Sequence, residues 1–450
     1  MSAPSLLALR QAKALHQAGK LAEAEKFYRE ALAADPNNAE ALQFLGVLKG
    51  QLGAREEALS LLARALGVNP ANPAAHYNRA NLLREAGRLA DALAGYNETL
   101  RLKPDHMGAR LNRSAVLAEN GDLNAALTDI ETLILAAPNE ARLHANRGAI
   151  LHRLSRYDEA IAATGRALTQ GGAEPRLLVQ RGDSQMELTN YWDALSDYEQ
   201  ALLRAPDLDT ALYGRASALM FLKRLDTAIV AFEVLLAKYP DYPYARGLLV
   251  QAKCNACDWR GRREAIDALL ADVREGKKAA SPLTVLAVSE SREANRRAAE
   301  IVTAGKFPTQ PPVARKPRPR GPRDRIRIAY LSADFRDHAV SQLTAGVFAQ
   351  HDRARFATLA ASFGPDDGSA MRKRLTGAFE EFADCRGMSA RQAAEWLAAR
   401  ADIAIDLNGY TGASRFDVLA CRPAPVAVNF LGYPGTTGAD YIDYIVADRT

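Results

Sequence analysis

The chain has 450 residues, of which 48% are hydrophobic and 25% are charged, with a formal net charge of +5. This length exceeds what one hydrophobic core usually serves, and it favours two or three folding units of ordinary soluble composition. The small net charge gives no reason to expect a nucleic-acid partner. No apolar run approaches the roughly 18 residues of a membrane-spanning helix. The four cysteines suggest no disulfide framework. Lys13, His16 and Lys20 interrupt the first apolar stretch and make it a poor signal peptide, so we expect a cytoplasmic protein with no membrane partner.

A pattern with a period of 34 residues fills roughly the first half of the chain. Small residues at fixed offsets with this period are typical of a two-helix repeat that stacks into a solenoid. We expect the alanine of each repeat to let two helices approach closely, and the proline to end the second helix. The alanines are Ala24, Ala58, Ala92, Ala126, Ala160, Ala194 and Ala228; the prolines are Pro36, Pro70, Pro104, Pro138, Pro206 and Pro240, with Gly172 in the remaining place; a third position holds Gly19, Gly53, Gly87 and Gly121, then Ser155, Thr189 and Lys223.

These units resemble tetratricopeptide repeats, and we expect an all-α array of about seven of them over residues 1–242. Each unit reads as helix A, a turn near the glycine position and helix B, as residues 73–96 illustrate. In arrays of this kind helix A lines the concave face, which is where a bound protein segment would lie.

Two polar lines recur along the expected helix A. Asn78, Asn112 and Asn146 lie 34 residues apart, and their amides can hydrogen-bond the backbone of an extended acceptor peptide with little regard for its side chains. A second interpretation stays open, in which these amides bond locally. We expect the arginines that follow one position later to pack their stems and to pair with neighbouring carboxylates. They are Arg79, Arg113, Arg147, Arg181 and Arg215.

The pattern weakens in residues 243–324, which read as a helical junction followed by a linker. Cys254 and Cys257 form a lone Cys-x-x-Cys without a second pair or a nearby histidine, so we expect buried structural thiols and no metal. Residues 306–322 are dense in proline and predict an extended segment. The basic residues between Arg315 and Arg327 fit a solvated linker better than a nucleic-acid or phosphate patch.

From residue 325 to residue 450, short β-rich segments alternate with helical ones. Such alternation predicts a parallel, doubly wound α/β sheet. The expected strands are residues 327–331, 356–363, a short one near 382, 401–407, 425–430 and 441–447; the expected helices are residues 341–351, 369–379, 391–400 and 416–420.

Polar and glycine-rich segments follow four of these strands, at residues 332–338, 364–369, 408–411 and 432–438. Ligands of doubly wound sheets bind beyond the carboxyl ends of the strands, so these segments form a candidate site. Each also has a structural explanation, since Asn408-Gly409 is a common turn sequence and residues 433–435 fit a type II turn. The chain has no Gly-x-Gly-x-x-Gly and no phosphate loop, but the spacing of Gly432, Gly435 and Gly438 lets backbone amides approach a diphosphate or a sugar.

Four motifs of this region resemble the amino-terminal catalytic lobe of protein O-GlcNAc transferases. They are Arg-Ile-Arg-Ile-Ala-Tyr-Leu-Ser-Ala-Asp-Phe-Arg-Asp-His at 325–338, Ser-Phe-Gly-Pro-Asp-Asp-Gly at 362–368, Asp-Leu-Asn-Gly-Tyr-Thr at 406–411, and Arg-Pro-Ala-Pro at 422–425 with Leu-Gly-Tyr-Pro-Gly-Thr-Thr-Gly at 431–438. The Cys-Asp-Trp at 257–259 also looks like the junction of that family. Repeats, junction and lobe stand in the order of the family, so the resemblance covers nearly the whole chain.

The resemblance implies transfer of N-acetylglucosamine from UDP-GlcNAc to serine or threonine hydroxyls of proteins, without a metal or other cofactor. It also implies that the lobe is one half of a two-lobed glycosyltransferase-B fold. It matches His338 to a histidine near the sugar, which can orient or deprotonate an acceptor hydroxyl, and it gives backbone amides the task of stabilising the leaving phosphate. Ser369 stands where the family usually has a threonine that contacts the sugar. The residues matched to the donor pocket are Leu431, Gly432, Pro434 and Gly435.

Two departures from the family keep alternatives open. Gln342 stands where a second histidine is usual, which argues against a mechanism with two histidines. The sequence ends at Thr450, before the second lobe that carries most nucleotide contacts, so we expect this chain to be truncated. The alternatives are a protein O-fucosyltransferase of the same family and a non-catalytic repeat scaffold; the partners would be protein or peptide acceptors and a nucleotide sugar, with a homo-oligomer open.

Overall fold

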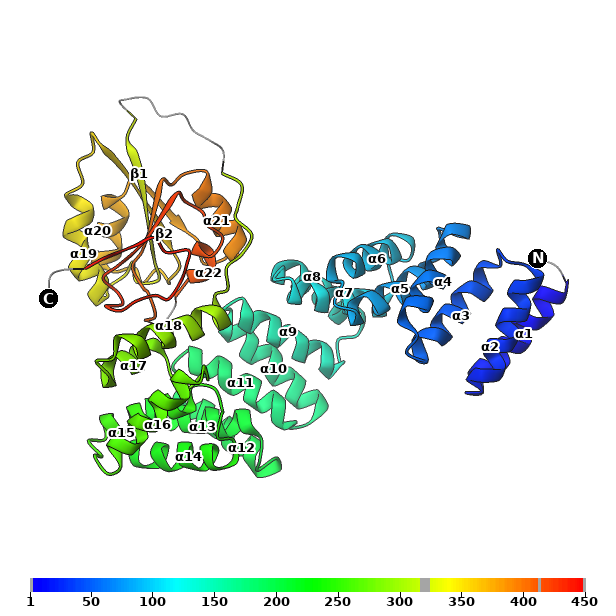
Figure 1. The fold of residues 1–450 in the computed structure, drawn as a ribbon, viewed down its shortest axis with the longest axis horizontal. Coiled ribbons are helices and arrows are strands. Elements are labelled where there is room, and N and C mark those ends of the chain that lie inside the picture. Colours follow the sequence, from blue (N-terminus) through cyan, green and yellow to red (C-terminus); the bar gives the residue numbers. More distant parts are fainter. Residues whose placement is uncertain (1–2, 316–323, 412–413, 448–450) are drawn as a thin grey trace. The chain divides into compact units, whose positions relative to one another are not determined.

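The computed structural model describes residues 3–315, 324–411 and 414–447. The chain divides into two compact units, residues 1–188 and 189–450, which are described separately here (Figure 1). Within the described residues, no helix is both long and apolar enough to cross a membrane.

The first unit is a stack of antiparallel helix pairs, as the repeat pattern predicts. Each helix packs on the next one along the chain, and the tightest pairs are those of one repeat. The helices are α1 (Ala3–Gln17), α2 (Leu21–Ala34), α3 (Ala39–Gln51), α4 (Arg55–Val68), α5 (Pro73–Glu85), α6 (Leu89–Leu102), α7 (Met107–Glu119), α8 (Leu123–Ala136), α9 (Ala141–Arg153), α10 (Tyr157–Gly171) and α11 (Pro175–Glu187).

The recurring small residues have the packing roles that the sequence predicts. All seven alanines of the pattern, from Ala24 to Ala228, are completely buried, so each second helix approaches its neighbours at that point. The proline of each repeat follows directly on the residue that caps the second helix. Where Gly172 replaces it, α10 runs one residue longer than its counterparts and ends in a left-handed glycine with φ of +82°.

The second unit begins with more repeat helices and continues into the junction. These helices are α12 (Tyr191–Arg204), α13 (Asp209–Phe221), α14 (Leu225–Lys238), α15 (Ala245–Asn255), α16 (Arg262–Arg274), α17 (Pro282–Val288) and α18 (Arg292–Lys306). The turn before each helix B keeps a left-handed backbone even without glycine, with φ of +60° at Thr189 and +61° at Lys223. It recurs 34 residues later at Cys257, with φ of +53°, so α15 stands in the place of a further helix A.

The thiol prediction is wrong for Cys257, which is exposed, whereas Cys254 is half-buried. The reason is its position in the left-handed turn between α15 and α16, outside both helices. Within the described residues, no group of three or more His, Cys, Asp or Glu side chains is arranged to hold a metal ion.

The rest of the second unit is a six-stranded parallel sheet in the order β3-β2-β1-β4-β5-β6, which confirms the doubly wound prediction. In register, Ile328 of β1 pairs with Thr358 of β2 on one side and with Ile403 of β4 on the other. The elements are β1 (Ile326–Ser332), α19 (Ala339–Ala349), β2 (Phe356–Ser362), α20 (Ala370–Ala378), β3 (Glu381–Asp384), α21 (Ala390–Ala398), β4 (Ile403–Asp406), α22 (Phe416–Leu419), β5 (Val426–Phe430) and β6 (Tyr444–Val446).

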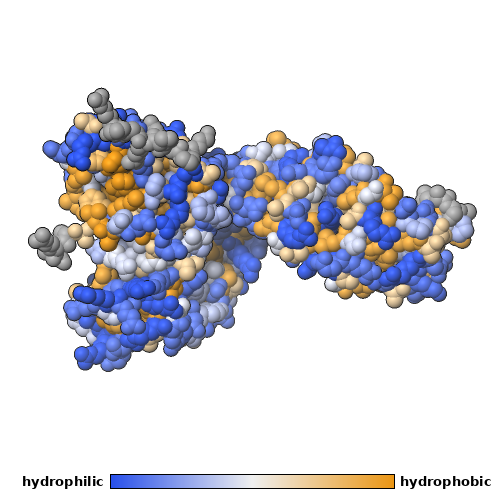
Figure 2. Space-filling model, turned by 45° about the horizontal axis from the view of Figure 1, so that its top comes forward, coloured by the Kyte–Doolittle hydropathy of each residue, from blue (hydrophilic) through white to orange (hydrophobic). Residues whose placement is uncertain are grey.

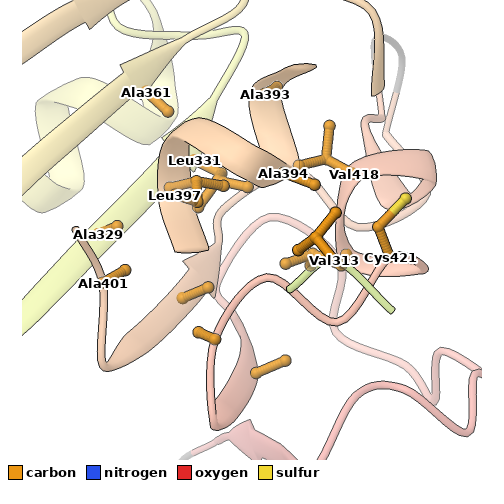
Figure 3. Close-up of a cluster of buried hydrophobic side chains, with 14 of the residues drawn as sticks. Val313, Ala329, Leu331, Ala361, Ala393, Ala394, Leu397, Ala401, Val418 and Cys421 are labelled. Atoms are coloured by element: carbon orange, nitrogen blue, oxygen red, sulfur yellow. The ribbon is translucent and has the colours of Figure 1, made fainter. Parts of the chain in front are cut away.

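Helices cover both faces of the sheet, and β1 contributes alternate residues to each core. Tyr330 packs with Phe348 of α19 and Leu375 of α20 on one face, whereas Leu331 packs with Leu397 of α21 on the other. In Figure 3, Leu331 and Leu397 lie together, and Val313 lies beside Val418 and Cys421. The segment before β1, which contains Val313, is therefore part of the same hydrophobic core as Leu331 and Leu397.

The proline-rich segment runs extended along the lobe up to residue 315, where Val313 donates its N–H to the carbonyl of Cys421. Residues 316–323, which hold most of the predicted basic linker, lie outside the described residues. Arg325 and Arg327 are not free cations, because they pair with Glu380 and Asp402.

Hydrophilic residues dominate much of the visible surface, with hydrophobic residues scattered among them (Figure 2).

Candidate functional site

Loops that follow β1, β2, β4 and β5 meet at the carboxyl edge of the sheet. The chain leaves β1 toward β2 on one side and reaches β4 on the other, so the strand order reverses between β1 and β4. Ligands of doubly wound sheets bind at this reversal. Residues 332–338 follow β1 and residues 407–411 follow β4, which places both on the two sides of the expected crevice.

Asn408 ties these two loops together. Its side-chain oxygen accepts the N–H of Ala333 at 2.9 Å, and its amide donates to a carboxylate oxygen of Asp334 at 2.7 Å. Both Asp334 and Asn408 are more than nine-tenths buried. A buried carboxylate needs such donors to offset its desolvation, and the result is a fixed orientation of the Asp334 carboxylate.

His338 is half-exposed at the start of α19 and caps this helix. Its Nδ1 accepts the N–H of Val340 at 3.3 Å and lies 3.7 Å from the same Asp334 carboxylate oxygen that Asn408 contacts. An Nδ1 that accepts a hydrogen bond places the proton of the neutral ring on Nε2, as assigned from this network. Nε2–H is thereby available as a donor, and a second proton on Nδ1 would face the carboxylate of Asp334.

The loop after β2 is joined to the loop after β1 through Asp367. This carboxylate accepts the N–H of Asp337 at 2.9 Å and the N–H of Ser369 at 3.1 Å. The backbone N–H of Asp337 is the main cause that lowers the pKa of Asp367 to about 2. Ser369 caps α20, since its hydroxyl accepts the N–H of Arg372 at 3.0 Å and can still donate its own proton.

Gln342 does not take the place of a second histidine at this edge. Its amide donates to the carboxylate of Asp337 at 2.8 Å. This hydrogen bond fixes the loop after β1 to α19, so Gln342 has a structural contact of its own.

A buried carboxylate supports the loop after β4. Asp406 accepts the N–H of Gly409 at 2.6 Å and the amide of Asn429 at 2.8 Å with the same oxygen. Burial raises the pKa of Asp406 to about 6, against the opposing effect of these two donors. The buried side chain of Asp406 therefore stabilises the turn that carries Asn408.

The loop after β5 begins with a strained residue. Leu431 has a left-handed φ of +70°, which is costly for a residue with a side chain, and that side chain is exposed. A Cβ on Gly432 would lie 2.0 Å from the carbonyl oxygen of Leu407, and one on Gly435 would lie 2.7 Å from the ring of Tyr433. Both glycines are thus required for packing inside the lobe, and the N–H of Gly432 already donates to the carbonyl of Phe430.

The prediction of a type II turn at residues 433–435 is wrong. Such a turn needs a positive φ at its third residue, and Gly435 is not among the described residues with positive φ. Pro434 is exposed, whereas Tyr433 is buried beneath the loop. Packing of the Tyr433 ring against Gly435, and not turn chemistry, explains the glycine.

The asparagines of the first unit differ from one another. Asn112 donates to the side-chain oxygen of Asn81 at 2.9 Å, whereas Asn78 and Asn146 are half-buried and make no side-chain hydrogen bond within the described residues. In the second unit the same position is Gly214, where a Cβ would lie 2.4 Å from the ring of Tyr198. The arginine line behaves as predicted at Arg113 and Arg147, which pair with Asp129 and Glu131. At Arg79 and Arg215 the predicted pairing is wrong, because their buried Nε atoms have no hydrogen-bond partner within the described residues.

Sequence reasoning missed three residues that shape the site. Asp334, Asp406 and Arg372 all lie inside or beside the quoted motifs, but no pattern in the sequence singles them out. Arg372 is buried and donates to the carbonyl of Phe335 and to the hydroxyl of Ser362, each at 2.8 Å. A charged residue at a buried position of α20 is the one signal that could have found it.

Comparison with known families agrees with this arrangement. Residues 290–450 match the family model described as glycosyl transferase family 41. Two models described as tetratricopeptide repeat match residues 15–82 and 51–111, and residues 111–175 and 179–243. Together these matches cover the repeats and the sheet lobe.

Curated relatives include a probable UDP-N-acetylglucosamine–peptide N-acetylglucosaminyltransferase named SEC from Arabidopsis thaliana, 39% identical over 126 residues, which are 28% of this chain and 13% of that protein. The enzyme of the corresponding name from Caenorhabditis elegans is 38% identical over 129 residues, 28% of this chain and 11% of that protein. The alignments thus span a small part of these relatives. A solved structure of an O-GlcNAc transferase variant from Thermobaculum terrenum covers 100% of this chain and 55% of its own, with 18% identity and a TM-score of 0.34.

Proposed function

We propose that the protein transfers N-acetylglucosamine from UDP-GlcNAc to serine or threonine hydroxyls of proteins, as the match of residues 290–450 to glycosyl transferase family 41 supports. The observation that carries the proposal is the linked set His338, Asp334 and Asn408 at the point where the strand order reverses. The relatives named as N-acetylglucosaminyltransferases support the choice of sugar.

His338 has the role of a donor to the acceptor hydroxyl or the sugar through Nε2–H, with Asp334 as the residue that positions its ring. Ser369, whose side chain also hydrogen-bonds the carboxylate of Asp367, is assigned to the sugar. Leu431, Gly432, Pro434 and Gly435 are assigned to the donor pocket, where the strained backbone of Leu431 is the supporting observation.

The chain is divided into the repeat array (1–242), the junction (243–324) and the sheet lobe (325–450). The array has the role of binding the acceptor protein, and the compartment is the cytoplasm. The amides of Asn78 and Asn146, which are unpaired within the described residues, support contact with an acceptor backbone. Asn112 is included with its amide already shared with Asn81.

The test uses the protein as its native cell produces it, with its intact mass measured first. Incubation with UDP-GlcNAc and with GDP-fucose, followed by mass spectrometry of acceptor proteins, distinguishes the sugar. We expect transfer of N-acetylglucosamine, and a loss of about 100-fold in His338→Ala with acceptor binding unchanged. Transfer of fucose alone, or of no sugar by wild-type protein, would refute the proposed activity.

Binding of acceptor proteins is tested separately in the triple variant Asn78→Ala, Asn112→Ala and Asn146→Ala. We expect weaker binding with the helical circular dichroism of the array retained. Unchanged affinity would remove the asparagine line from acceptor recognition.

A further inference from the structure

A cavity of about 260 Å³ lies within the second unit, and the loop after β4 forms part of its wall. Its walls come from α13, α15, the start of α17, the end of α18 and the loop after β4. Its aromatic and polar lining residues include Tyr213, Tyr244, Lys306, Phe307, Tyr410 and Ser414. The cavity is therefore bounded by repeat helices on one side and by the sheet lobe on the other.

The charge of the cavity is unbalanced. Lys306 is the one charged side chain among its described lining residues, and no carboxylate lines it. The ammonium of Lys306 lies 4.7 Å from the centre of the Tyr244 ring and pairs with no carboxylate in the described part of the chain. A cation over an aromatic face with no counter-ion favours an anionic ligand at the same place.

Two further observations indicate that the cavity is built for a ligand. The hydroxyl oxygen of Ser414 is buried and lines the cavity, and it has no hydrogen-bond partner within the described residues. Buried polar atoms are normally paired, so a ligand atom is the expected partner. Tyr244 has a left-handed φ of +66° at the start of α15, a strained conformation of the kind found at functional sites.

The size and the lining of the cavity restrict the kind of ligand that it can bind. The cavity exceeds the roughly 150 Å³ that hold a benzene ring, and tyrosine and phenylalanine rings form much of its lining. It therefore accommodates the side chain of an amino acid better than a sugar nucleotide. Tyr213 lies on α13, the helix A of its repeat, so one wall of the cavity comes from the repeats that are assigned to the acceptor.

We propose that this cavity binds a carboxylate side chain of the acceptor polypeptide, with Lys306 as the charge partner and Ser414 as a hydrogen-bond partner. This specificity rests on the proposed function, because it names which acceptors the enzyme prefers. Acceptors with a glutamate at a fixed distance from the modified residue would be bound in preference to those with glutamine.

The experiment measures binding of fluorescent peptides to the native full-length protein by anisotropy, with a single glutamate or glutamine moved along a serine-containing peptide. We expect glutamate at one position to bind about tenfold tighter than glutamine, as for a charged hydrogen bond. Lys306→Met should abolish this preference, and Lys306→Glu should reverse it toward a lysine-bearing peptide. The matched control is Lys278→Met, an exposed lysine nearby that does not line the cavity.

Equal binding of the two peptides, or an equal loss in Lys278→Met, would overturn the proposal. Competition with free glutarate separates the sources of the carboxylate, since Lys306-dependent binding of glutarate without any peptide preference would overturn the acceptor assignment. A glutamate preference that survives when no sugar is transferred to any peptide supports the cavity and counts against the proposed function alone.

Discussion

In the repeat array, Gly19, Gly53, Gly87 and Gly121 have left-handed φ values, and a Cβ on any of them would meet nothing within 4 Å. In the sheet lobe, Gly364 and Gly432 are not left-handed, but a Cβ would lie 1.7 Å from the carbonyl oxygen of Ala333 and 2.0 Å from that of Leu407. The array needs glycine for its backbone angle, whereas the lobe needs it for space. An angle can be adopted by other residues at a modest cost, and Ser155, Thr189 and Lys223 do so; a backbone clash cannot be relieved in this way.

The largest difference is therefore expected between Gly432→Ala and Gly53→Ala. Gly432→Ala forces the loops after β4 and β5 apart and should cost about 4 kcal/mol or more of lobe stability. Hydrogen exchange followed by mass spectrometry resolves the lobe from the array, which matters because the chain has two units. Exchange in residues 403–430 that matches wild type would contradict the steric explanation.

Buried and exposed arginines give the next comparison. Arg372→Met should cost about 3 kcal/mol, because it removes two hydrogen bonds from buried acceptors and the guanidinium that lies 4.4 Å from the centre of the Phe382 ring. Arg147→Met should cost less than about 1 kcal/mol, since its pair with Glu131 is partly exposed to solvent. Urea unfolding of both variants, monitored by hydrogen exchange of each unit, tests the ranking, and equal losses would contradict it.

Asp406 makes the stability of the lobe sensitive to pH. Its pKa is about 6 in the folded protein against a usual 3.8, so the folded state binds more protons between these values. Lobe stability should then fall as pH rises through this window, by about 3 kcal/mol in total, and change no further from this group above pH 6.

Asp406→Asn keeps one acceptor for Gly409 and should remove that pH dependence. The measurement is the free energy of unfolding of the lobe at pH 4 and pH 7 in both proteins. A slope that persists in Asp406→Asn would assign it to other groups.

The smallest effect is expected at the array turns. Gly53→Ser introduces a side chain into open space at a left-handed position and should cost about 1 kcal/mol. Lys223→Gly should recover a similar amount at the equivalent turn, less the chain entropy that glycine adds to the unfolded state. Thermal unfolding of the two variants in parallel tests whether the turns are interchangeable.

The fold was accessible to sequence reasoning because periodicity and alternation are local signals. Residue positions 34 apart predict the helix pairs, and the expected strand at 356–363 differs from β2 by one residue at its end. The strand expected at 441–447 shrinks to Tyr444–Val446, since an apolar segment does not reveal how many of its residues find a pairing partner. The divisions at residues 242 and 324 stay predictions.

The candidate site was only partly accessible. Motifs indicate which loops gather at the sheet edge, but the partners of His338 depend on a contact between residues 74 positions apart, Asp334 and Asn408. Side-chain networks of this kind come from the register of the sheet, which a single sequence does not encode locally. The hydroxyl of Ser414, which has no partner in the described part of the chain, and the strained backbone of Tyr244 likewise have no signal in the sequence.

The left-handed turn recurs every 34 residues from Gly19 to Cys257, with φ between +53° and +84°. A tandem duplication or loss of one whole unit between two such turns joins matching backbone conformations at both ends. Arrays of different length can thus arise in evolution without a new turn, and each unit changes the length of polypeptide that helix A faces can span. The sheet lobe would be inherited unaltered while the array grows or shrinks.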